Sequence, residues 1–261
     1  MYAPSANLKI MVDAARKAGR GLMRDFAELE NLQASVKGPG DFVSAADRKA
    51  EASIKKDLMT ARPAYGWLGE ETGEEKGADE TRRWIVDPLD GTTNFLRAIP
   101  HWAVSIALEH KGEIIAGVIY DPAKQDLFVS EKGGGAWLND RRIRVAPTRD
   151  LSRALLGTGV PFGAKNTLPQ TARELTRLMP QTAGLRRMGS AALDLAYVAA
   201  GRLDFFWERE INAWDMAAGL LLVREAGGIL ADLSGGDDPL ASGWVAAGTP
   251  DLFEKIREHL I

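Results

Sequence analysis

The first sixty residues of the chain have a helical pattern of hydrophobic and polar positions. Apolar side chains recur every three to four positions over residues 5–30, which predicts an amphipathic helix. The tetrapeptide SAAD at 44–47 has the form of a capping box and predicts a second helix, with Ala50, Ile54 and Leu58 along one side. Each helix would have one apolar face to pack against a neighbouring layer.

The pattern changes to that of strands between residues 84 and 145. Five short apolar segments follow one another there: WIVD, WAVSIAL, EIIAGVIY, QDLFVS and RIRV. Asn139-Asp140 predicts a turn between GAWL and RRIRV. Upstream, YGWLGEE at 65–71 predicts another short strand, which runs into the polar and exposed loop TGEEKGADET.

Strands and helices alternate after about residue 150. ALLGTG and LDFFWE predict strands, and residues 170–179 predict a helix. Capping residues predict three helix starts and one helix end: Ser190, Asp215 and Thr249-Pro250, with Gly227-Gly228 at the end. Helices and antiparallel-looking strands in layers predict a mixed α/β (α+β) sandwich. We expect a single unit over 1–261, with a possible division into halves 1–148 and 149–261.

Composition restricts the partners and the location of the protein. The chain has 261 residues, of which 45% are hydrophobic, so it can bury a substantial core. The net charge is −3 and the charges are interspersed, so no basic stripe indicates a nucleic-acid partner. The longest apolar runs are shorter than 18 residues, and the N-terminus lacks the apolar core of a signal peptide. The sequence therefore predicts a cytoplasmic protein that does not bind membranes.

The side chains available for chemistry are mainly carboxylates. The chain has no cysteine and only three histidines, which excludes thiol nucleophiles and cysteine-ligated metals and disfavours a histidine-rich metal site. It also lacks the GxSxG nucleophile elbow and the GxxxxGK[ST] phosphate loop. Carboxylate oxygens are suited to Mg²⁺ or Mn²⁺.

The segment WIVDPLDGTTNF at 84–95 combines two carboxylates with a small, hydroxyl-rich turn. Residues three apart in a regular strand face opposite sides, but Pro88 breaks the ladder and can bring Asp87 and Asp90 to the same end. Gly91 permits a close backbone approach, and Thr92-Thr93 can open a helix whose free N–H groups favour an anion. Two acids beside an anion would repel a phosphate unless cations lay between them, so this segment predicts a metal site. The alternative is a solvated turn followed by a helix cap.

Four other positions, in three segments, could contribute to a site with residues 84–95. Glu70 directly follows the strand YGWLG and could supply a third ligand, although the acidic run around it is also typical of a solvated loop. Asp215 stands at a helix start and could be a cap, a metal ligand or both. Gly189 and Ser190 begin another helix, which could bind polar groups or be simply capped by the serine.

Together these motifs resemble the inositol monophosphatase family of metal-dependent, lithium-sensitive phosphatases. The resemblance rests on GEE at 69–71, DPLDGTTNF at 87–95, WDMAAG at 214–219 and EAGG at 225–228, which occur in the family's order. It extends over roughly residues 8–250. It implies a layered αβαβα sandwich and a homodimer.

The resemblance implies two or three Mg²⁺ ions per active site, with Mn²⁺ as a possible substitute. Glu70, Asp87 and the carbonyl of Leu89 would bind the first ion. Asp87, Asp90 and Asp215 would bind the second, and Glu70 would also reach a third. Leu89 replaces the isoleucine common in the motif, which should be harmless because the ligand is a carbonyl oxygen.

The same resemblance assigns catalytic and substrate contacts. The catalytic residues would be Glu70, Asp87 and Thr92, with Thr92 and Glu70 orienting the attacking water. Gly91 and Thr92 would bind the phosphate through their backbone, and Asp47 would lie near the metals. The substrate side would be formed by Asp90, Gly189, Ser190, Ala191, Glu208 and Asp215.

The function implied is Mg²⁺-dependent hydrolysis of a small phosphorylated polyol, with myo-inositol 1-phosphate preferred as substrate. The segment EREINAWD departs from the animal-type sequence between Glu208 and Asp215, where selectivity is set. The alternatives within the family are histidinol phosphate, 3′-phosphoadenosine phosphates and fructose 1,6-bisphosphate. An additional RNA-binding or transcription role is the alternative of a different class.

Overall fold

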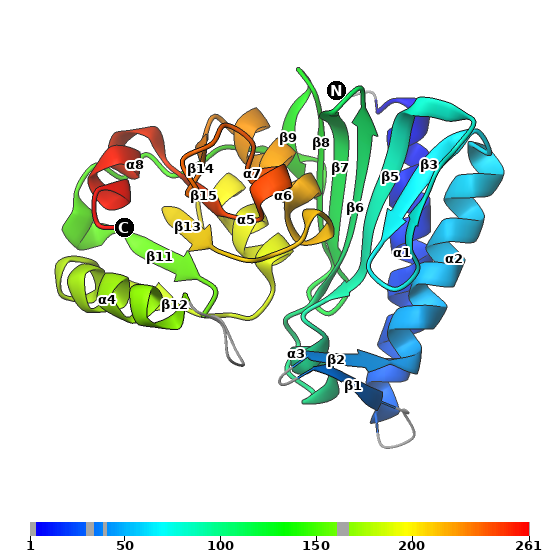
Figure 1. Ribbon diagram of the computed structural model, residues 1–261, viewed down its shortest axis with the longest axis horizontal. Helices are drawn as coiled ribbons and strands as arrows, with labels where there is room; N and C mark the ends of the chain where they lie inside the picture. Colours follow the sequence, from blue (N-terminus) through cyan, green and yellow to red (C-terminus); the bar gives the residue numbers. More distant parts are fainter. Residues whose placement is uncertain (1–3, 30–33, 39–40, 161–166, 261) are drawn as a thin grey trace.

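The elements are arranged in five layers that alternate between helices and sheets (Figure 1). The computed structural model describes residues 4–29, 34–38, 41–160 and 167–260, with the backbone alone described for 34–38 and 41–44. The three helical layers are formed, in order, by α1 (Ala6–Ala27) with α2 (Ala45–Ala61), α5 (Ala191–Ala199) with α6 (Ala213–Glu225), and α4 (Leu168–Leu178) with α8 (Pro250–Arg257). This is the αβαβα sandwich expected from the sequence.

The larger sheet lies between the first two helical layers. Its strand order is β10-β9-β8-β7-β6-β5-β3-β4, and β3 and β5 are its only parallel neighbours among the described strands. The strands are β3 (Tyr65–Gly69), β4 (Gly73–Glu75), β5 (Asp79–Asp90), β6 (Ala103–His110), β7 (Glu113–Asp121), β8 (Asp126–Glu131), β9 (Gly135–Leu138) and β10 (Arg141–Ile143). The expected loop at 72–81 is partly ordered as β4 and the start of β5, because the free edge of β3 offers backbone partners and an edge strand tolerates charged side chains.

The smaller sheet lies between the central and last helical layers. Its order is β12-β11-β13-β15-β14, with β11 parallel to both of its neighbours and the other pairs antiparallel. The strands are β11 (Leu155–Thr158), β12 (Gly184–Arg186), β13 (Phe205–Glu208), β14 (Ile229–Asp232) and β15 (Val245–Gly248). The remaining short elements are the hairpin β1 (Ala34–Gly38) and β2 (Asp41–Ser44), the helices α3 (Thr92–Leu96) and α7 (Pro239–Ser242), and the 3₁₀ turns Leu151–Arg153 and Met179–Gln181.

Small residues bring the central helices close to the larger sheet. A Cβ atom added to Gly117 of β7 would lie 3.0 Å from the carbonyl oxygen of Ala218, and one added to Gly219 would lie 2.6 Å from the side chain of Leu195. The backbone of α6 therefore packs directly on β7, and α5 packs directly on α6. This close packing fixes the start of α6 relative to the neighbouring strands.

The start of α6 corrects one sequence prediction. Asn212 is the N-cap, and Asp215 is the third residue of the helix rather than its cap. The Asp215 carboxylate accepts a hydrogen bond from the Asn212 N–H at 2.6 Å, which completes a capping box. The predicted starts at Ser190 and Thr249-Pro250 and the glycine end of α6 are confirmed. Of the helices in the described part of the chain, none has the length and apolar content needed to cross a bilayer.

Candidate metal centre and active site

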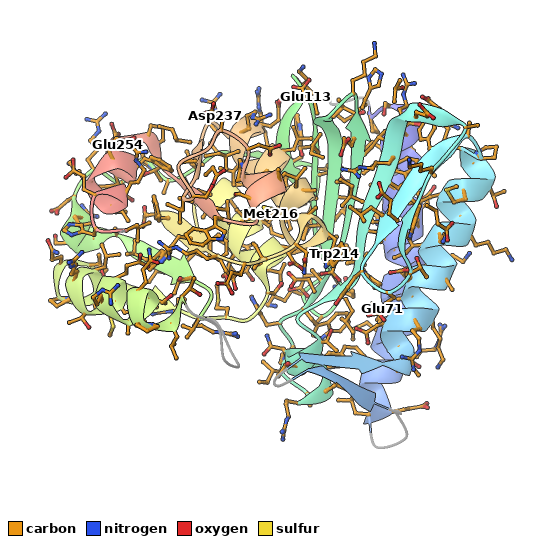
Figure 2. The ribbon with its side chains drawn as sticks, in the orientation of Figure 1. Glu71, Glu113, Trp214, Met216, Asp237 and Glu254 are labelled. Carbon is orange, nitrogen blue, oxygen red and sulfur yellow. The ribbon has the colours of Figure 1, made fainter. Side chains whose placement is uncertain are left out.

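Three aspartates from two distant segments meet at one end of the larger sheet. Asp87, Asp90 and Asp215 each offer one carboxylate oxygen, and these oxygens all lie within 4.8 Å of one another. Asp87 is 2% exposed and Asp90 8%. Trp214, the neighbour of Asp215, and Glu71, the neighbour of Glu70, both lie towards this end of the larger sheet (Figure 2). The structure therefore brings together the three aspartates that the resemblance assigned to the second metal.

A β-bulge turns Asp87 and Asp90 to a common side. Asp87 is opposite Ser105 on β6, whereas Asp90 is opposite Ala103, so three steps on β5 match two steps on β6. The extra residue lies in the Pro88-Leu89 segment, as expected from the missing N–H of proline. The Leu89 N–H turns inward and donates to Asp87 Oδ1 at 2.9 Å.

A hydrogen bond from the same region holds α6 against the sheet. Ser105, the strand partner of Asp87, donates through its hydroxyl to the carbonyl of Trp214 at 3.3 Å. Asp215 follows Trp214 directly, so the register of β5 and β6 and the start of α6 are tied together. The Ser105–Trp214 hydrogen bond thus joins the segments that carry Asp87 and Asp215, which are far apart in the sequence.

Asp90 also connects the bulge to the start of α5. Its Oδ2 accepts hydrogen bonds from the hydroxyl of Ser190 at 2.6 Å and from the Ala192 N–H at 2.7 Å. Burial raises the pKa of Asp90 to about 6, even though the hydrogen bonds from Ser190 and the helix backbone act to lower it. The Ser190 hydroxyl additionally accepts from the Leu193 N–H at 3.3 Å, so it caps α5 while it binds Asp90.

The carboxylates of Asp87 and Asp215 lie among other negative charges, and among the described residues no neighbouring cation is a main cause of their pKa shifts. Burial, followed by the charges of Glu70, Asp90 and Asp215, raises the pKa of Asp87 well above its ordinary value. Burial, followed by the charge of Asp90, does the same to the pKa of Asp215. Buried carboxylates of one sign favour either protonation or a bound cation. Their oxygen-only donor set fits a hard divalent cation such as Mg²⁺ or Mn²⁺.

Glu70 is placed beside the aspartates by the parallel pairing of β3 and β5. Gly69 at the end of β3 is opposite Val86, and the Glu70 N–H donates to the Val86 carbonyl at 3.1 Å. Since Gly69 and Val86 form the last pair of these parallel strands, the next residues, Glu70 and Asp87, lie side by side at this end of the sheet. The charge of Glu70 raises the pKa of both Asp87 and Asp215, consistent with this position.

Two buried acids of α2 support this edge. The hydroxyl of Thr92 lies 2.9 Å from Asp47 Oδ1 and 3.1 Å from the Leu89 carbonyl oxygen. One turn later, Glu51 Oε2 accepts a hydrogen bond from the Glu71 N–H at 2.8 Å. Asp47 was expected near the metals, but the sequence interpretation missed Glu51. The available signal was its spacing of four from Asp47, which places both acids on one face of α2.

The backbone at Gly91 forms the junction between the bulge and α3. Gly91 has φ +96°, and an added Cβ would lie 3.1 Å from the His101 carbonyl oxygen and 3.2 Å from that of Gly189. Only glycine fits this position without strain. Asn94 of α3 donates to the carbonyls of His101 and Met188, both at 2.8 Å. The predicted phosphate-binding residues 91–92 and polyol-binding residues 189–191 therefore adjoin one another.

The comparison with known proteins agrees with this geometry. Residues 4–260 match the inositol monophosphatase family. The chain belongs to the inositol monophosphatase family. It is 57% identical over 256 residues to an inositol-1-monophosphatase of Rhizobium meliloti (strain 1021), covering 98% of this chain and 96% of that protein. It is 46% identical over 253 residues to the Nus factor SuhB of Escherichia coli (strain K12), covering 97% and 95%. A crystal structure of the extragenic suppressor protein suhB from Bartonella henselae has a TM-score of 0.95 at 52% identity, covering 98% of both chains.

In this family member, Glu208 approaches the centre from the smaller sheet. It ends β13, and its charge raises the pKa of Asp215 and of Asp194, a second buried acid. Asp194 is 2% exposed, and burial is the main cause of its raised pKa. The sequence interpretation missed Asp194, although a single acid in the apolar helix SAALDLAYVAAG was a visible signal. Glu208 is the only one of the predicted site residues that the smaller sheet supplies.

Proposed function

We propose that this protein is a Mg²⁺-dependent phosphomonoesterase that hydrolyses myo-inositol 1-phosphate to inositol and phosphate. The observation that carries the proposal is that carboxylate oxygens of the buried Asp87 and Asp90 and the partly buried Asp215 lie within 4.8 Å of one another. The similarity to the Rhizobium meliloti inositol-1-monophosphatase over nearly the whole chain supports the substrate. Two or three Mg²⁺ ions are proposed per site, with Mn²⁺ as a substitute.

The metal would be held by the carboxylates of Glu70, Asp87, Asp90 and Asp215 and by the Leu89 carbonyl. When bound, it would neutralise phosphate charge and make a water more acidic. Thr92 can donate its hydroxyl proton to Asp47, 2.9 Å away, which leaves its oxygen free to accept a hydrogen bond from the attacking water. Glu70 would take the proton of that water as a general base.

The phosphate would bind between this water and the polyol, because the attacking oxygen and the leaving oxygen lie in line on either side of the phosphorus. The N–H groups of Gly91, the N-cap of α3, and of Thr92, its first residue, would donate to phosphate oxygens, because a helix start leaves its N–H groups without intrahelical partners. The polyol hydroxyls would contact the substrate-side residues Asp90, Gly189, Ser190, Ala191, Glu208 and Asp215. The Ser190 and Ala192 hydrogen bonds to Asp90 support this side by fixing α5 against the bulge.

A panel of phosphate esters tests the substrate. Phosphate release would be measured side by side from myo-inositol 1-phosphate, histidinol phosphate, 3′-phosphoadenosine 5′-phosphate and fructose 1,6-bisphosphate, at fixed Mg²⁺. We expect the highest kcat/KM for myo-inositol 1-phosphate. A tenfold or greater preference for another ester would replace the proposed substrate, and hydrolysis of none of them would contradict the proposed activity.

A second role in an RNA or transcription complex is supported by the similarity to a protein named a Nus factor. The same fold would then carry a binding surface outside the carboxylate cluster. RNA binding by the protein that persists in Asp87→Asn would support this role, and no detectable binding by the native protein would remove it. Homodimerisation, lithium inhibition and a cytoplasmic location remain predictions from the family resemblance.

A further inference from the structure

A second buried group of charges lies on the other side of β13 from the carboxylate cluster. Arg209 donates to both oxygens of Glu174 on α4, at 2.7 and 2.9 Å. The side chains of Arg209 and Glu174 are 4% and 1% exposed. The indole N–H of Trp207 also donates to Glu174 at 3.1 Å, and the Arg209 guanidinium lies 5.4 Å from the ring centre of Trp244. This pair fixes the end of β13 to α4 by a two-point contact, the geometry in which arginine is most specific.

Glu208 points to the face of β13 opposite the Arg209–Glu174 pair. Trp207 and Arg209 both reach Glu174, so they leave the chain on one face, and Glu208 between them points to the other face. That second face belongs to the central layer, where Phe206 is part of the core beside α5 and α6. Glu208 is therefore directed towards Asp194 and Asp215, whose pKa values its charge raises.

The backbone on both sides of Glu208 leaves little room for another conformation. The carboxylate of Glu208 lies against Gly159 so closely that a Cβ atom on Gly159 would overlap it. The Gly159 N–H and the Thr158 hydroxyl both bond to the Trp207 carbonyl, at 3.3 and 2.8 Å. After Arg209, Glu210 adopts a φ of +59°, a left-handed conformation that a residue other than glycine keeps only when its surroundings enforce it.

We propose that Arg209 and Glu174 are positioning residues that hold Glu208 in the orientation needed to recognise substrate hydroxyls. This inference rests on the proposed function and goes beyond it, because neither residue faces the carboxylate cluster. The pair acts through the backbone of β13. Without it, the strand end would be held by its pairing with β15, where Glu208 is opposite Val245, and by the Gly159 hydrogen bond. Glu208 could then shift away from Asp215 and from the substrate. The Arg209–Glu174 pair therefore affects the selectivity for esters that carry hydroxyl groups rather than the hydrolysis step itself.

The test compares two esters that differ in hydroxyl groups. The kcat/KM of myo-inositol 1-phosphate is divided by that of phenyl phosphate, whose leaving group has no hydroxyl beyond the ester oxygen. The variants are Glu208→Gln, the double replacement Glu174→Leu with Arg209→Met, and all three together. The double replacement removes both charges at once, so that no charge is left buried without its partner. Arg149→Gln, which breaks the exposed contact to Asp251, is the matched control.

We expect the ratio to fall about tenfold in the double variant, which is the effect of misplacing one hydrogen-bonding group. It should fall by a similar factor in Glu208→Gln and no further in the triple variant, while Arg149→Gln keeps the native ratio. A folded double variant with the native ratio would overturn the inference and show that the pair only stabilises the fold. Equal losses for both esters, or additive losses in the triple variant, would also overturn it. A native protein that hydrolyses neither ester would instead contradict the proposed function, and this inference with it.

Discussion

Two groups of buried or partly buried charged side chains differ in how their charge is balanced. Asp87, Asp90 and Asp215 have the same sign. Burial raises the pKa values of all three, and repulsion from neighbouring carboxylates raises those of Asp87 and Asp215 further. Arg209 and Glu174 have opposite signs and are joined by two hydrogen bonds. Charges balanced in this way do not favour a bound ion and serve to fix a strand. Unbalanced carboxylates favour a bound cation. This difference separates the Arg209–Glu174 pair, which supports the fold, from the carboxylate cluster, which is suited to bind metal.

The largest expected effect comes from removing one charge of the unbalanced group. Asp87→Asn keeps the size of the side chain and an acceptor for the Leu89 N–H, which lies 2.9 Å away, but removes a metal ligand. We expect phosphatase activity to fall by about 10³-fold or more, because metal stabilisation of phosphate charge contributes several kcal/mol. Initial rates at saturating Mg²⁺ would measure it, with Asp13→Asn on the exposed side of α1 as control. Activity above about a tenth of the native value would contradict the role of Asp87.

Substitution in the Arg209–Glu174 pair should lower the stability of the fold. Arg209→Met leaves Glu174 buried without its cation, and we expect the free energy of unfolding to fall by about 3–5 kcal/mol. Adding Glu174→Leu should recover part of that loss, because it removes the unpaired charge but also the acceptor of the Trp207 N–H. Urea denaturation of the single and double variants would measure both effects. A single variant as stable as the native protein would show that the pair contributes little to the fold.

Stability without metal should decrease as the pH rises from about 4 to about 6. The pKa of Asp90 is about 6 in the folded protein against an ordinary value of 3.8. Between these values the folded state binds more protons than the unfolded state, so raising the pH favours unfolding by up to about 3 kcal/mol. Urea denaturation in a chelator at several pH values would measure the slope. Asp90→Asn should reduce it, and an unchanged slope in that variant would contradict the assignment.

Asp215→Asn should have a smaller effect on stability than Arg209→Met, and in the opposite direction. Without metal, Asp215→Asn relieves repulsion from Asp90 and Glu70 and retains an oxygen for the Asn212 N–H. We expect the free energy of unfolding at pH 7 to increase by about 1–2 kcal/mol. Asp251→Asn, which removes an exposed partner of Arg149, is the control. A less stable Asp215→Asn protein would show that the carboxylate is needed for the fold itself.

Local patterns predicted much of the fold and of the site. The strands from 84 to 145 and the helix of 170–179 followed from periodicity, and the bulge followed from the missing N–H of Pro88. The motif order connected Glu70, Asp87 and Asp215 before their contacts were visible. Short strands such as β12, β14 and β15 were missed because three or four residues carry too little periodicity.

Contacts between distant segments could not be predicted from local patterns. The Arg209–Glu174 pair joins residues 35 positions apart, and neither lies in a motif that the resemblance covers. Asp215 was expected as the cap of α6, but the cap is Asn212, and the Asn212 and Asp215 side chains form a capping box. Glu51 and Asp194 are buried acids with a local signal in the sequence, but their partners become visible only when their elements pack together.

The central claim is that the carboxylate cluster is a metal centre for phosphate-ester hydrolysis. Phosphate release from myo-inositol 1-phosphate by protein stripped with a chelator and then titrated with Mg²⁺ tests it most directly. The account predicts no turnover before Mg²⁺ is added, a saturable increase afterwards, and no such increase in Asp87→Asn. Turnover that is insensitive to the chelator, or an equal Mg²⁺ response in Asp87→Asn, would contradict it.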